Sequence, residues 1–175
     1  SLNPAARKAY SRMEVLKLLR ACKKCNFREH TVNTLRAAII LSYLRGMRRE
    51  EIANIHPAHI DNRKGAASLL IPKTKTDTPR TIPLDWKTLT AARCLADTQS
   101  KRGLPTIMFS AKFKIVREKS GLPSGDFHCL RHSFMTWTAK KGLTPQQIAS
   151  VSGHKTLSMV ARYTHLEGTE VRDLL

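Results

Sequence analysis

The stretch SLLIPKTKTDTPRTIPL, residues 68–84, decides the fold class of this 175-residue chain. Two short runs, Ser68–Pro72 and Arg80–Leu84, flank a polar, turn-rich segment at residues 74–79, which is the pattern of a β-hairpin. A shorter strand is expected around Ile60, before the hairpin. We therefore predict a small antiparallel sheet of three strands and not a parallel one.

Helical patterns precede this sheet. Ser11–Glu14 has the form of a capping box and opens an amphipathic segment in which Val15, Leu18 and Cys22 recur at helical spacing. A second helix is predicted from Thr31 through Leu44, ended by Gly46, and a short third one from Arg48 through Ile55.

Helical patterns also follow the sheet. The predicted helices are residues 86–97, 110–119, 128–140, 144–152 and 156–166, with a possible last helix at 168–175. Thr144 and Pro145 form a suitable cap and first position. The expected fold class is therefore mainly α with one small antiparallel sheet (α+β), in a single domain covering residues 1–175.

The charge of the chain points to a polyanionic partner. Lysine and arginine total 31 against 13 acidic residues, which gives a net charge of +18 and a pI near 10.4. Charge reports the sign of the partner and not the chemistry, so a solvated basic surface or a ribosomal type of protein stays open on this ground alone.

The sequence gives little support for a membrane-spanning protein or for a zinc-binding protein. No apolar run approaches the roughly 20 residues that span a bilayer, and the first residues lack the apolar stretch of a signal peptide, so we expect a cytoplasmic protein. Cys22 and Cys25 have the spacing of half a zinc site, but no second Cys/His pair has ligand spacing. Cys94 and Cys129 are isolated, and reduced thiols are expected.

One helix carries a polar group that could do chemistry. On a helical wheel Leu130, Phe134 and Trp137 lie on a core side, while Arg131 and His132 flank His128. Taken alone, His128 and Arg131 would more often be surface or capping residues. The same kinds of residue recur at other helix starts and turns, and together they form a set: Arg48 after Gly46, Lys75 in the hairpin, His154 after Gly153, and Tyr163.

This set resembles the catalytic domain of the tyrosine recombinases, the phage integrase family. The matching segments are GMRREEI (46–52), TK (74–75) before RTIPL (80–84), HCLRH (128–132), GHK (153–155) and ARYTH (161–165). Any one motif is weak, but six positions in order at family-like spacing rarely arise by chance. Ser152 stands where the family usually has leucine, and Cys129 is an uncommon residue at its position; we expect neither to touch the chemistry.

The resemblance implies strand cleavage by Tyr163, which attacks phosphorus and leaves a 3′-phosphotyrosyl bond and a free 5′-hydroxyl. That bond conserves the energy of the cut, so religation needs neither ATP nor a metal, and no cofactor is expected. Without the resemblance, Tyr163 would more often be interpreted as a core aromatic. Tyr10 precedes the first helix and Tyr43 lies in an apolar one, so both are poorer candidates.

A phosphodiester also needs its charge neutralised and its leaving group protonated. The resemblance implies that Arg48 and Arg131 clamp the two non-bridging oxygens through their guanidinium groups. Spacing alone does not separate Arg48 from Arg49. Lys75 is the candidate general acid for the 5′-oxygen, with Lys73 as its rival.

The remaining polar residues receive supporting roles. His128 is expected in proton transfer at the tyrosine, and His154 in a hydrogen bond to the scissile phosphate. Glu51, three residues after Arg48, is expected to orient active-site groups and not to react. His132 and His165 are expected to be structural.

Two rival functions remain open beside a recombinase or integrase. A type IB topoisomerase shares the tyrosine mechanism, although the short spacing from HCLRH to Tyr163 favours the recombinase branch; a non-catalytic DNA-binding module would lack a catalytic residue. Family members usually carry a separate N-terminal core-binding domain, which this chain is expected to lack. The expected partners are double-stranded DNA and further recombinase protomers in a tetrameric synapse, with the apolar stripe of residues 168–175 docking on a neighbour.

Overall fold

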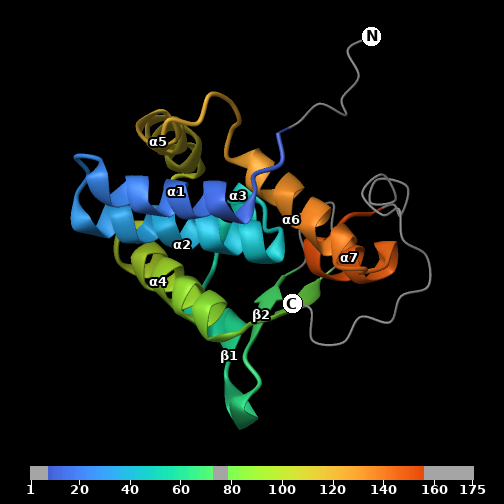
Figure 1. Ribbon diagram of the computed structural model, residues 1–175. Coiled ribbons are helices and arrows are strands. Elements are labelled where there is room, and N and C mark those ends of the chain that lie inside the picture. Colours follow the sequence, from blue (N-terminus) through green and yellow to red (C-terminus); the bar gives the residue numbers. More distant parts are fainter. Residues whose placement is uncertain (1–7, 73–78, 156–175) are drawn as a thin grey trace.

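The computed structural model describes residues 8–72 and 79–155 of the chain (Figure 1). Its helices are α1 (Arg12–Lys24), α2 (Glu29–Arg45), α3 (Arg49–Ala53), α4 (Trp86–Arg102), α5 (Thr106–Lys119), α6 (His128–Lys140) and α7 (Pro145–Ser152). Two 3₁₀ turns, η2 (Pro57–His59) and η3 (Arg63–Gly65), accompany the strands β1 (Ile60–Asp61), β2 (Ser68–Ile71) and β3 (Arg80–Pro83). The helices predicted at 156–166 and 168–175 lie outside the described residues, as do Lys73, Lys75, Tyr163 and His165.

The predicted sheet is confirmed. Its strands follow the order β1-β2-β3, and both neighbouring pairs are antiparallel. Leu69 of β2 lies opposite Ile82 of β3, and both side chains are fully buried because alternate residues of a strand face the same side. The intervening Leu70 and Thr81 are exposed.

Helix α2 lies at the centre of the helical part and packs against α1, α4, α5 and α6 (Figure 1). Because it has neighbours on several sides, buried residues occur all around it and not on one stripe. It begins two residues before the predicted Thr31, at Glu29. Gly46 ends it as predicted, in the left-handed conformation with φ 67°.

Other helix boundaries differ modestly from prediction. The capping box of Ser11 and Glu14 is present, and Thr144 caps α7 by accepting from the backbone N–H of Gln147. Helix α4 continues beyond residue 97 to Arg102, where Gly103 ends it, and α5 begins directly after Pro105. None of the helices within residues 8–72 and 79–155 is long and apolar enough to cross a bilayer.

Helix α6 departs from the predicted division into one core face and one polar face. Leu130 and Phe134 are fully buried as expected, but Arg131, predicted to flank His128 on the polar face, is only 2% exposed. The reason is its position between α2 on one side and α7 on the other. A helix wheel gives the direction of each side chain but not which directions are covered by neighbours.

Candidate active site

The side chain of Arg131 joins the ends of two helices. Its Nη1 donates to the carbonyl oxygen of Gly46, after α2, at 2.6 Å and to that of Ser152, the last residue of α7, also at 2.6 Å. Carbonyl groups at a helix C-terminus carry partial negative charge, so two such ends stabilise a buried cation. Arg131 is therefore fixed in place by backbone atoms.

His154 lies beside this guanidinium. Its Nδ1 is 2.7 Å from the Ser152 hydroxyl, and Arg131 Nη2 lies 3.2 Å from Nδ1 and 3.4 Å from Nε2. Burial, followed by the positive charges of Arg131 and Arg48, lowers the pKa of His154 to about 3, with smaller contributions from His128 and Arg80. His154 is consequently a neutral imidazole at neutral pH.

Glu51 connects two other basic residues to this group. Its Oε1 accepts from the backbone N–H of Arg48 at 2.9 Å, and its Oε2 forms an ion pair with Arg80 Nη1 at 2.5 Å. Arg48 is the half-buried cap of α3. Its neighbour Arg49 instead contacts the Ser110 hydroxyl of α5. The structure thus places Arg48 next to Glu51 and among the charges that act on His154, whereas Arg49 contacts α5.

Arg80 is a member of the cluster that sequence reasoning missed. Its Nε donates to the carbonyl of Val151 at 2.7 Å, which ties β3 to α7. Gly153 leaves room for it, because a Cβ there would lie 2.6 Å from Nη1 and 2.7 Å from Cζ of Arg80. A signal was present: Arg80 alternates with Thr81 and shares the inward side of β3 with Ile82, an unusual position for arginine.

His128 is the first residue of α6 and is exposed. The start of this helix is fixed by a reciprocal pair, in which Asp126 Oδ1 accepts from the backbone N–H of Cys129 at 3.1 Å and Cys129 Sγ accepts from that of Asp126 at 3.4 Å. The unusual Cys129 thus helps to hold the turn that bears His128. His132, one turn later, is half-buried.

Ser152, which we expected not to touch the chemistry, contacts two of the candidate site residues. Its hydroxyl is a hydrogen-bond partner of His154, and its carbonyl accepts from Arg131. The residue closes α7 directly before the glycine turn, and a helix end brings its side chain and the following histidine close together.

The two described tyrosines are packed into the protein. Tyr10 is 4% exposed, and its hydroxyl donates to the carbonyl of Ser124 at 2.9 Å; burial raises its pKa. Tyr43 is half-buried against Trp137, and burial raises its pKa as well. Neither is suited to act as a nucleophile, because burial of the phenol disfavours the phenolate that would attack phosphorus.

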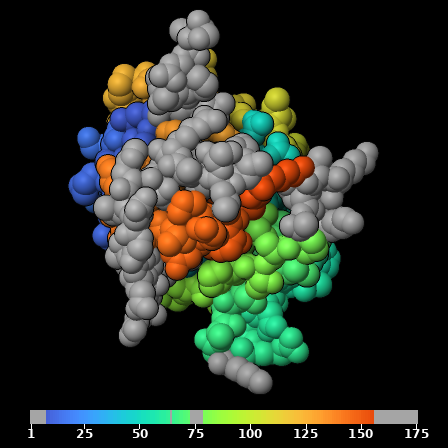
Figure 2. Space-filling model, turned by 90° about the vertical axis from the view of Figure 1, so that its right-hand side faces the viewer, coloured from blue at the N-terminus to red at the C-terminus, as the bar shows by residue number. Residues whose placement is uncertain are grey.

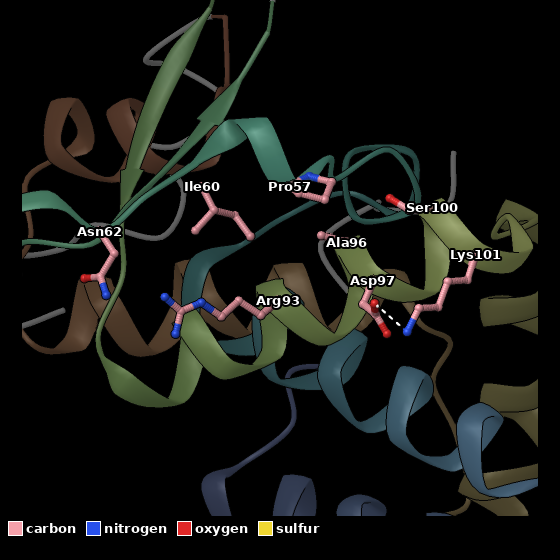
Figure 3. Close-up of a pocket in the computed structure, with 8 residues that line it drawn as sticks. All are labelled: Pro57, Ile60, Asn62, Arg93, Ala96, Asp97, Ser100 and Lys101. Carbon is pink, nitrogen blue, oxygen red and sulfur yellow. Dashed lines mark ion pairs between the residues drawn. The ribbon is translucent and has the colours of Figure 1, made fainter.

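Figure 2 shows the segments that carry Arg131 and Arg80 side by side, with α6 and α7 (orange to red) next to the green part of the chain that contains the strands. A separate hollow of about 460 Å³ lies between β1 and α4, lined by Ile60, Arg93 and the ion pair of Asp97 with Lys101 (3.0 Å) (Figure 3). None of the candidate site residues that the structure describes lines this hollow.

The fold is that of the catalytic domains of tyrosine recombinases. The structure matches XerH site-specific recombinase bound to difH substrate with TM-score 0.74 and 20% identity, over 90% of this chain and 50% of that one. It matches a lambda integrase tetramer bound to a Holliday junction with TM-score 0.70 and 20% identity, over 99% of this chain and 52% of that one.

The family of the chain is shown by comparison of its sequence with a family model. The model of the phage integrase family matches residues 10–170, and the chain belongs to this family. A curated relative, the shufflon-specific DNA recombinase of Escherichia coli, is 29% identical over 128 residues, which are 71% of this chain and 33% of that protein. The chain thus spans about one third of the length of this relative.

Proposed function

We propose that this chain is the catalytic domain of a site-specific DNA recombinase or integrase, which cleaves and rejoins strands through a covalent 3′-phosphotyrosyl intermediate. The observation that carries the proposal is the setting of His154. Arg131 Nη2 lies 3.2 Å from its Nδ1, and burial followed by the charges of Arg131, Arg48, His128 and Arg80 lowers its pKa. A neutral hydrogen-bonding group within a cluster of cations suits a phosphate diester, whose charge increases in the transition state.

The geometry supports distinct roles for the two arginines. Arg131 Nη1 is engaged by two carbonyls, whereas Nη2 lies at the His154 ring. Nη2 and His154 would therefore meet one non-bridging oxygen together, and Arg48 would meet the other. Glu51 positions the backbone of Arg48 and neutralises Arg80, which makes Arg80 a positioning residue.

The nucleophile and the acid belong to the same proposal. Lys75 lies in the connection between β2 and β3, five residues before Arg80, and Tyr163 follows His154 by nine residues. Each of these two residues is therefore close in the chain to a described residue of the site, Lys75 to Arg80 and Tyr163 to His154. Tyr163 would attack phosphorus, His128 would assist transfer of the tyrosine proton, and Lys75 would protonate the departing 5′-oxygen. No metal, ATP or other cofactor is required by this sequence of steps.

The partners are proposed as double-stranded DNA and further copies of the recombinase. XerH is bound to difH DNA and the lambda integrase tetramer to a Holliday junction. A tetrameric synapse, with residues 168–175 docking on a neighbouring protomer, is the corresponding assembly here. We place the protein in the cytoplasm at the nucleoid, as one domain over residues 1–175 that works with a separate core-binding domain.

A covalent selection from random DNA tests this function and identifies the target site in the same experiment. The protein is incubated with a random duplex library in EDTA without ATP, and SDS-resistant protein–DNA complexes are sequenced. Wild-type protein should enrich a defined site, and Tyr163→Phe should give no covalent complex. Binding without covalent capture would indicate a non-catalytic module, and relaxation of any supercoiled plasmid without site enrichment would indicate a topoisomerase.

A further inference from the structure

Ser152 has two polar contacts with the site, to which the proposed function assigns no role. Its side chain is fully buried; its Oγ lies 2.7 Å from His154 Nδ1, and its carbonyl accepts from Arg131 Nη1 at 2.6 Å. The hydrogen bond of the hydroxyl depends on the serine side chain. Leucine, the residue more usual at this position in the family that the sequence resembles, could not form it.

The position of Arg131 leaves the in-plane lone pair of Nδ1 to this hydroxyl. Arg131 Nη2 is 3.2 Å from Nδ1 and 3.4 Å from Nε2. A donor aligned with the lone pair of one ring nitrogen lies in the ring plane and is much farther from the other nitrogen. The nearly equal distances therefore place Nη2 over the imidazole ring and not at the edge where Ser152 lies.

The direction of the Ser152 hydrogen bond determines where the imidazole proton is. A neutral imidazole has one N–H donor and one acceptor nitrogen. If Nδ1 accepts from the serine hydroxyl, the proton is on Nε2, which can donate to an anionic oxygen. If Nδ1 donates to the serine, Nε2 presents a lone pair to that oxygen, and the two repel. Among the described residues, His154 Nδ1 is the acceptor available to the Ser152 hydroxyl.

We propose that Ser152 is a positioning residue that fixes His154 in the neutral tautomer protonated on Nε2, so that Nε2–H donates to a phosphate oxygen. The phosphate contact rests on the proposed function, whereas the tautomer itself does not. The Ser152 hydroxyl donates to Nδ1 of the imidazole. This hydrogen bond fixes the orientation of the ring and keeps its proton on Nε2.

The tautomer can be measured directly by ¹⁵N NMR of histidine-labelled full chain, with His154→Gln identifying the His154 signals among the seven histidines. The wild-type ring should show an unprotonated Nδ1 and a protonated Nε2. Ser152→Ala should shift both nitrogens toward the average of the two tautomers, and Ser152→Thr should restore the wild-type pattern. Ser150→Ala is the matched control, because Ser150 is exposed on the same helix and donates to the Gln147 carbonyl.

Cleavage of a suicide duplex carrying the selected site supplies the second measurement. Ser152→Ala should slow single-turnover cleavage about 3- to 10-fold, the scale of one hydrogen bond, with DNA affinity unchanged. Ser152→Thr should recover the rate. If Ser152→Ala does not fold, Ser152→Cys, with its weak S–H donor, replaces it.

The outcomes separate the two proposals. A wild-type ring protonated on Nδ1, or a ring unchanged in Ser152→Ala, overturns the role of Ser152 whatever the enzyme does. A wild-type protein with the Nε2–H tautomer but no covalent product supports the positioning of the ring and overturns the proposed function. A rate loss in Ser152→Ala that Ser152→Thr does not recover attributes the effect to packing and contradicts the hydrogen bond.

Discussion

At the scale of the residue, the site depends on charges that are buried and still compensated. Arg131 is 2% exposed and donates to two carbonyls at helix ends, while Arg80 and Glu51 form a buried ion pair. Removing one partner from such an arrangement leaves an uncompensated buried charge, which is strongly destabilising. His154 avoids this cost by remaining neutral.

The neutral His154 predicts a specific pH dependence of stability. The unfolded chain binds a proton on this residue below its ordinary pKa of 6.5, whereas the folded chain binds it only near the lowered pKa of about 3. The free energy of unfolding should therefore fall as the pH falls from 6.5 toward 3. Between pH 7 and pH 4, wild type should lose about 2–3 kcal/mol more than His154→Gln in urea unfolding. Equal losses in the two proteins would show that His154 titrates normally in the folded state.

The role of Lys75 can be separated from phosphate binding by changing the leaving group. If Lys75 protonates the 5′-oxygen, Lys75→Ala should cleave normal DNA at least ~100-fold more slowly than wild type. A substrate with sulfur at the bridging 5′ position releases its leaving group without a proton, so the variant should recover most of its rate.

Two matched variants complete the Lys75 experiment. Arg131→Ala should show no rescue by sulfur, because a clamp on the non-bridging oxygens acts whichever atom leaves. Lys73→Ala should cleave the oxygen substrate at close to the wild-type rate. Failure of sulfur to rescue Lys75→Ala, or equal rescue of Arg131→Ala, would refute the assignment and make Lys73 the next candidate acid.

At the scale of the element, glycines place the ends of α2 and α7 close to the site. A Cβ on Gly46 would collide with the ring of Phe134 in α6, and one on Gly153 would collide with Arg80. These glycines therefore set both the backbone turn and the approach of a neighbouring element. The carbonyl of Gly46 also accepts from Arg131, so Gly46 both allows the close packing of Phe134 and positions a candidate site residue.

Gly46→Ala should cost more stability than the same change at a glycine with open space. Gly121 ends α5 with φ 77°, close to the 67° of Gly46, and its backbone N–H donates to the Glu118 carbonyl, but nothing lies within 4 Å of its Cβ position. Gly121→Ala should cost about 1 kcal/mol from backbone strain alone, and Gly46→Ala about 2–4 kcal/mol because Phe134 must also move. Equal costs in denaturant unfolding would show that the α2–α6 approach is looser than the structure indicates.

The sequence predicted the helices and strands better than the contacts that form between them. The strands, the Ser11 capping box and the Gly46 stop follow from local rules, and the structure confirms them. The burial of Arg131, the place of Arg80 and the contact of Ser152 with His154 depend on segments far apart in the chain. Local periodicity cannot predict such contacts. Lys75 and Tyr163 stay predictions, because they lie outside the described residues.

At the scale of the whole molecule, the net charge of +18 dominates the encounter with a polyanion. Non-covalent binding of duplex DNA should show little sequence preference in this domain, because phosphate contacts carry most of the affinity, so site enrichment in the covalent selection would report the cleavage step. Each phosphate contact contributes about −0.9 to the slope of log K against log salt, so a slope of about −4 or steeper is expected in a fluorescence anisotropy titration. A flat slope would contradict the electrostatic account, whatever the active site does.

The central claim is that Tyr163 becomes covalently joined to a 3′-phosphate of DNA, and peptide mapping of the trapped complex tests it most directly. Wild-type protein is trapped on a suicide duplex and digested with nuclease and trypsin, and the nucleotide-bearing peptide is sequenced by mass spectrometry. The adduct should lie on Tyr163, within the tryptic peptide of residues 163–172, and the released strand should carry a 5′-hydroxyl. An adduct on any other residue, or a 5′-phosphotyrosyl linkage, would contradict the account.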